Sequence, residues 1–229
     1  TAALALVALT RGRLGAAVEL GRRAADLAPR PDQSLGVAAL AAAYGGDVAL
    51  GTELAGRLAA IATSPTLEGF AHYVAGEVAA VAGDVEGAEE RYRRAIALGR
   101  RSGATFVEGI ASVGLLTVRA AAGRVGEALD GYRGLLDYWE RTGGWAQQWT
   151  TLRNLARLLR DLGDHDVAGL LDAAADAAPD APPPAGPRSA PGAGGLDAAR
   201  AAAPPAGRAE VLAVARAAIA RHRRAVPSP

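Results

Sequence analysis

A short glycine-led phrase recurs five times along this 229-residue chain, and its spacing constrains the fold more than any other feature. The phrase is Gly, then Asp or Arg, then Leu, Val or His, and it begins at Gly12, Gly46, Gly83, Gly123 and Gly163. Successive glycines are 34, 37, 40 and 40 residues apart, which is typical of stacked helical hairpins. Since glycine readily adopts the left-handed backbone that ends a helix, each phrase predicts a turn between two helices.

Residues at fixed offsets after each glycine also repeat. Five residues on, the side chain is always small: Ala17, Gly51, Ala88, Ala128 and Ala168. Twelve residues on, it is always Ala or Leu: Ala24, Leu58, Ala95, Leu135 and Ala175. These offsets fall on one face of a helix. The pattern therefore predicts a second helix in each hairpin whose small residues allow close contact with its neighbours.

The chain is predicted to be all-α, with five helix pairs in residues 1–178. Breakers such as Ser64-Pro65 and Gly143-Gly144 separate one pair from the next. The predicted pairs are 2–11 with 13–28, 32–44 with 47–62, 66–82 with 85–101, 104–122 with 125–141, and 145–162 with 165–178.

The second helix of the third pair resembles the tetratricopeptide repeat. That family's pattern of Gly, Ala, an aromatic residue and Ala is matched by Gly83, Ala88, Tyr92 and Ala95. The resemblance implies a right-handed α-solenoid of about five hairpins, whose first helices line a concave groove. A solenoid end normally has a polar cap, yet residues 2–7 are apolar. We therefore expect the chain to be the C-terminal piece of a longer polypeptide.

Two further segments follow the repeats. Residues 179–207 are rich in Pro, Gly and Ala and predict a disordered linker. Residues 208–226 regain helical spacing, with an apolar stripe and five Arg, and predict a short amphipathic helix. This helix has two interpretations: it docks on the repeats as a cap, or it offers a basic surface to a protein partner or to nucleic-acid phosphates.

Composition argues against several functional classes. The chain has no Cys, its basic residues are all Arg, and its formal net charge is +1. Without Lys there is no phosphate-binding loop of the Gly-Lys type, and the three His lie in separate elements. We therefore expect no enzymatic activity, no metal or cofactor, no direct nucleic-acid contact and no membrane span. The simplest location for such a chain is the cytoplasm, and its Ala, Gly, Arg and Pro bias indicates a high-GC genome.

All three Trp of the chain lie within residues 139–149. Trp145 and Trp149 follow a helical stripe that continues into leucines, so packing between repeats is one interpretation. The other is an anchor site for a protein partner, since Trp and Tyr dominate binding hot spots.

A basic stripe offers the second candidate site. Arg153, Arg157 and Arg160 share one face of a predicted first helix. The tetratricopeptide resemblance would turn this face toward the groove, where an acidic peptide or a chain-end carboxylate could pair with it. The same resemblance places Tyr73 and Glu77 in the groove of the third pair. The alternative is an ordinary solvated surface.

The stretches 83–95 and 149–159 are similar to the C-terminal helical arrays of large bacterial transcriptional activators of the signal-transduction ATPase type. In that family the array receives the signal or the protein partner, while ATP-binding and DNA-binding domains lie elsewhere in the polypeptide. The resemblance implies a sensing or protein-interaction module of a transcriptional regulator, with those domains upstream. A free-standing adaptor or scaffold for a multiprotein complex is the alternative.

Overall fold

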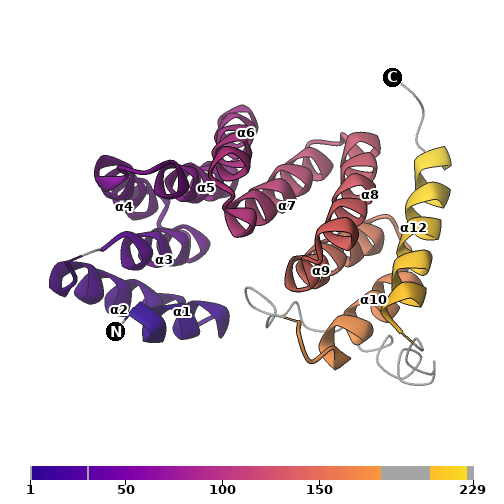
Figure 1. The fold of residues 1–229 in the computed structure, drawn as a ribbon. Coiled ribbons are helices and arrows are strands. Elements are labelled where there is room, and N and C mark those ends of the chain that lie inside the picture. Colours follow the sequence, from indigo (N-terminus) through magenta and orange to yellow (C-terminus); the bar gives the residue numbers. More distant parts are fainter. Residues whose placement is uncertain (1, 30, 182–206, 226–229) are drawn as a thin grey trace. The chain divides into compact units, whose positions relative to one another are not determined.

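The chain is helical throughout the parts that the structure describes. The structure is a computed structural model that describes residues 2–29, 31–181 and 207–225, and these ranges contain eleven helices and no strand (Figure 1). The helices are α1 (Ala2–Thr10), α2 (Leu14–Leu27), α3 (Asp32–Tyr44), α4 (Val48–Ile61), α5 (Pro65–Val81), α6 (Val85–Ser102), α7 (Thr105–Ala121), α8 (Val125–Thr142), α9 (Trp145–Asp161), α10 (His165–Ala177) and α12 (Arg208–Ala225). The all-α prediction is confirmed for these residues. Most of the predicted linker, residues 182–206, lies outside them.

Each of the five repeated glycines lies in the turn between two helices, as their spacing predicts. Their φ angles are 69°, 91°, 79°, 79° and 85° at Gly12, Gly46, Gly83, Gly123 and Gly163, which is left-handed backbone that L side chains rarely adopt. Where Asp follows the glycine, its carboxylate can begin the next helix. Asp84 Oδ1 accepts a hydrogen bond of 2.9 Å from the backbone N–H of Gly87, and Asp47 does the same for Leu50 at 3.0 Å.

The described chain divides into two compact units, residues 2–118 and residues 119–225, and each is described by itself. In the first unit, each helix from α1 to α5 packs against the next one in sequence. In addition, α3 packs against both α1 and α5, so the first helices of successive pairs are neighbours. This sequential pairing is consistent with a helical repeat.

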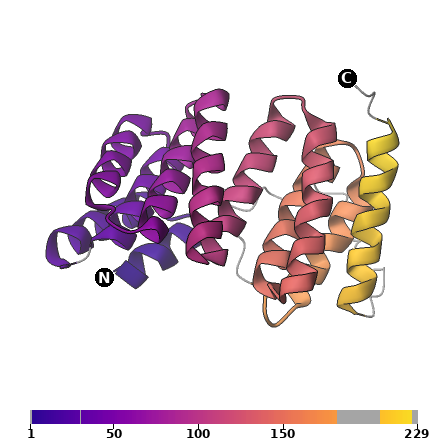
Figure 2. The ribbon, with the colours of Figure 1, turned by 45° about the horizontal axis from the view of Figure 1, so that its top comes forward.

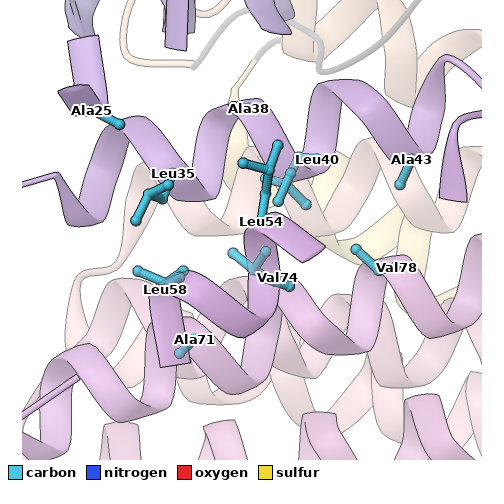
Figure 3. Close-up of a cluster of buried hydrophobic side chains, with 12 residues drawn as sticks. Ala25, Leu35, Ala38, Leu40, Ala43, Leu54, Leu58, Ala71, Val74 and Val78 are labelled. Carbon is cyan, nitrogen blue, oxygen red and sulfur yellow. The ribbon is translucent and has the colours of Figure 1, made fainter. Parts of the chain in front are cut away.

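The core of the first unit is built from small and branched aliphatic side chains. Figure 3 shows Leu35 of α3, Leu54 and Leu58 of α4, and Val74 of α5 meeting between these helices. All four are at most 2% exposed. The repeated small positions are buried as well, so the predicted close-contact face of the second helices is confirmed.

The second unit contains α8, α9, α10 and α12. Helix α12 packs against α8 and α10 (Figure 2), and its apolar stripe is buried there. The stripe consists of Val211, Leu212, Ala215, Ala218 and Ile219, each at most 2% exposed. Of the two interpretations of this helix, the arrangement favours docking. None of the helices in the described ranges is long and apolar enough to cross a membrane.

Candidate functional site

Three tyrosines converge on one carboxylate in the first unit. Tyr44 ends α3, Tyr73 and Glu77 lie one turn apart on α5, and Tyr92 comes from α6. We call these four residues the Glu77 cluster. It joins the two residues that the sequence placed in the groove, Tyr73 and Glu77, to two that the sequence did not assign to a site.

Both oxygens of Glu77 accept hydrogen bonds from phenols. Tyr92 Oη donates to Glu77 Oε1 at 2.8 Å, and Tyr44 Oη donates to Oε2. The Tyr73 ring contacts the ring of Tyr92, with centroids 6.4 Å apart, and stacks on Phe70 at 6.3 Å. The carboxylate is thus held by donors on two neighbouring helices and flanked by aromatic rings.

Two glycines make room for the central ring of the cluster. A Cβ at Gly76 of α5 would lie 2.9 Å from Tyr92 Cε1, and a Cβ at Gly114 of α7 would lie 2.6 Å from the same atom. Tyr92 is 1% exposed and occupies the aromatic position of the repeat. Glycine on both adjacent helices is therefore what lets the ring enter and its hydroxyl reach Glu77.

Burial controls the electrostatics of the cluster. It raises the pKa of Glu77, against the hydrogen bonds from Tyr44 and Tyr92, which lower it. Burial and the nearby carboxylate likewise raise the pKa of Tyr92 well above its ordinary value, so this phenol remains a hydrogen-bond donor at neutral pH. The cluster is not sealed, because Tyr44 remains 40% exposed and Tyr73 and Glu77 are half-buried.

The two predicted Trp lie together in the second unit beside the start of α12. Trp149 is 5% exposed, and its Nε1 donates to Asp180 Oδ1 at 2.9 Å. The Arg208 guanidinium lies 4.3 Å from the centroid of the Trp145 ring and 5.5 Å from that of Trp149. Arg208 also pairs with Asp180 at 2.5 Å. An open hollow of about 520 Å³ adjoins this cluster, between the end of α10 and the start of α12.

The predicted basic stripe on α9 is largely engaged within the chain. Arg153 pairs with Asp176 at 3.0 Å, and Arg160 pairs with Asp172 at 2.5 Å. Both acids belong to α10, the second helix of the same pair. Arg157, which lies between the two on the stripe, is exposed. The stripe thus ties α9 to α10 through Arg153 and Arg160, while both Arg157 and Arg160 are exposed to solvent.

Helix α12 is oriented by ion pairs that sequence reasoning missed. Arg216 contacts Asp137 at 2.8 Å and Glu140 at 2.5 Å, both on α8. Asp164, at the start of α10, receives Arg221 and also His222 at 2.9 Å. Burial alone would raise the pKa of Asp164. The hydrogen bonds from His222 and Arg221 outweigh burial and hold this pKa below its usual range. The signal was present in α8, where acidic residues recur at positions 130, 137 and 140 on one face.

Comparisons with known proteins leave the family open. No protein-family model matches the chain, and neither a curated protein nor a solved structure matches it. Within the described part of the chain, no group of three or more His, Asp or Glu is placed to hold a metal ion. What can be stated is an all-helical protein of stacked, sequentially packed helices, consistent with a helical repeat.

Proposed function

We propose that the five helix pairs form a tetratricopeptide-like α-solenoid that binds a protein partner, as the sensing or interaction module of a bacterial transcriptional regulator. One observation carries this proposal: the Glu77 cluster draws side chains from α3 and α5, which are neighbouring first helices. In a tetratricopeptide array, first helices line the binding groove. If the helix pairs form such an array, the cluster would lie where the array meets its ligand.

The chemistry of the cluster suits recognition of a partner. Tyr44 and Tyr73 present partly accessible phenol rings on rigid helices. Tyrosine is enriched at binding hot spots because it combines a large apolar face with a hydrogen-bonding group. A site of this kind needs no cofactor, and its residues supply binding contacts.

Exposed apolar surface on α1 supports a place within a larger polypeptide. Leu4 is 59% exposed, and Leu6 and Val7 are each 40% exposed. Apolar side chains grouped on a surface often mark contacts with another protein or domain. An upstream ATPase domain would cover them in a regulator, whereas a separate subunit would cover them in an adaptor. A phosphate-binding loop and a helix-turn-helix domain encoded upstream in the same reading frame would favour the regulator.

Binding to an array of random 12-residue peptides tests the interaction function. The protein should select a subset of these peptides with Kd values in the micromolar range by fluorescence anisotropy. Tyr73→Ala should weaken that binding at least tenfold. Phe106→Ala is the matched control, because Phe106 is an aromatic residue on α7 that is 59% exposed. If no peptide binds above the background of scrambled sequences, or if both variants behave like the parent, the proposal is wrong.

A further inference from the structure

We propose that the Glu77 cluster binds the cationic side chain of an Arg or Lys residue in a partner peptide. This inference rests on the proposed function, because it names the chemical class of ligand for that same site. It differs from the acidic peptide that the Arg stripe of α9 predicts.

The first reason is that the charge of Glu77 has no counter-ion. No Arg or His of residues 2–29, 31–181 and 207–225 forms an ion pair with this carboxylate, and its hydrogen-bond donors, Tyr44 and Tyr92, are both neutral phenols. Carboxylates withdrawn from water are normally paired with a cation, because the charged form is costly to desolvate.

The two fully buried carboxylates of this unit follow that rule. Glu89 is 3% exposed and pairs with Arg93, while Glu108 is 4% exposed and pairs with Arg100 at 2.7 Å. Glu77 departs from the rule, although the chain is rich in Arg. The missing cation is therefore a feature of this site, and a ligand can supply it.

The second reason is that the carboxylate keeps unused hydrogen-bond acceptor positions and has aromatic rings beside it. An ionised carboxylate offers about four acceptor positions, and the two phenols occupy one on each oxygen of Glu77. The rings of Tyr44 and Tyr73 lie beside the carboxylate, and aromatic faces attract guanidinium and ammonium groups. A guanidinium group fits both features, because it donates two parallel hydrogen bonds and stacks on aromatic rings.

The third reason is access. Tyr44 is 40% exposed at the end of α3, so the cluster reaches solvent at that side. An extended peptide crossing α3 and α5 could insert one long side chain here while its backbone stays outside. Arg and Lys have the length and flexibility for this, with an aliphatic stem that can pack on a tyrosine ring.

The test uses the full chain and matched peptides. Each 12-residue peptide selected by the parent protein is resynthesised with its Arg or Lys replaced by citrulline or Gln, which keep the shape and remove the charge. Affinities are measured by fluorescence anisotropy for the parent, for Glu77→Gln and for Glu90→Gln. Glu90 is the matched control, because it is an exposed Glu on α6 that pairs with Arg94. Thermal melts of the three proteins confirm that they are folded.

The expected result is a coupled loss. Removing the peptide's charge weakens binding to the parent at least tenfold, Glu77→Gln weakens binding of the charged peptide by a similar factor, and the two changes together cost no more than either alone. Glu90→Gln binds like the parent. Selected peptides that bind equally well without their cation, or that bind Glu77→Gln unchanged, overturn this inference and leave the interaction function standing. If no peptide binds at all, both fall.

A second arm separates a peptide from a free small cation. The probe is n-butylguanidinium, titrated against the parent protein and Glu77→Gln. Weak binding, at least a hundredfold below that of the Arg peptides, is expected, because the peptide adds contacts along α3 and α5. Binding as tight as that of the peptides would overturn the assignment to a peptide side chain.

Discussion

Replacing Gly114 with Ala should destabilise the protein, although Ala is the better helix former. The new Cβ would lie 2.6 Å from Tyr92 Cε1 and 2.7 Å from Cζ, whereas ordinary contacts begin near 3.4 Å. The ring has little freedom to retreat, because its hydroxyl is bound to Glu77 at 2.8 Å and the backbone at Gly76 lies close to the same ring edge. Overpacking of this kind costs about 1–3 kcal/mol.

The free energy of unfolding should fall by about 2 kcal/mol in total. The confined ring puts the cost of overpacking at about 3 kcal/mol, and the higher helix propensity of Ala offsets about 1 kcal/mol of it. For a chain of this size the melting temperature should fall by roughly 4–8 °C. Thermal and urea unfolding, followed by circular dichroism at the helix band, measure both quantities.

Two further variants make the reasoning testable. Gly56→Ala is the control, since a Cβ there has no neighbour within 4 Å, and it should stabilise by up to about 1 kcal/mol. Adding Gly114→Ala to a Tyr92→Leu background should be neutral or stabilising, because the ring that obstructs the methyl group is gone. If Gly114→Ala matches or exceeds the parent in stability while Tyr92 is present, the packing argument fails.

The remaining predictions concern Trp149, Glu77 and Arg216. Trp149→Ala should lower the free energy of unfolding by about 3–5 kcal/mol, as large-to-small core changes do; unchanged thermal stability would instead favour a binding role for this residue. Glu77 has a raised pKa in the folded protein, so its contribution to stability is most favourable below its unfolded pKa of about 4.3 and is lost as pH rises through the folded pKa. Glu77→Gln should therefore gain stability over the parent between pH 4 and pH 7 in urea titrations, and parallel curves would contradict this. Arg216→Glu places like charges beside Asp137 and Glu140, so amide hydrogen exchange should accelerate in α12 but not in α3; equal acceleration in both helices would refute a local effect.

Sequence predicted the parts of this fold that local backbone chemistry decides. Each helix end lies within one residue of its predicted position, because glycine turns, Asp caps and Ser64-Pro65 act on the residues beside them. The buried small positions followed for the same reason. Because these positions lie at a fixed number of residues after the turn, the turn determines which face of the second helix is buried. This does not depend on the sequence of the helix packed against it.

The sites were harder to predict because they depend on how helices are rotated and staggered. Tyr44 and Glu77 are 33 residues apart, and nothing local indicates that their side chains meet. The Arg stripe shows the same difficulty. A face carrying Arg153 and Arg160 fits either a groove or a neighbouring helix, and the acids at positions 172 and 176 of α10 were the signal for the second.

The docking of α12 has a consequence for the order in which the helices of the second unit assemble during synthesis. The acids that receive Arg216 and Arg221 lie 79 and 57 residues earlier in the chain, on helices that can pair with sequence neighbours as soon as these have been made. At roughly 5–20 residues per second, α12 begins to emerge some 2–6 s after the end of α10. During that interval the acidic and apolar surface of α8 and α10 lacks its cover. A chaperone or a nascent partner that binds such surfaces could do so during this interval, before α12 covers them.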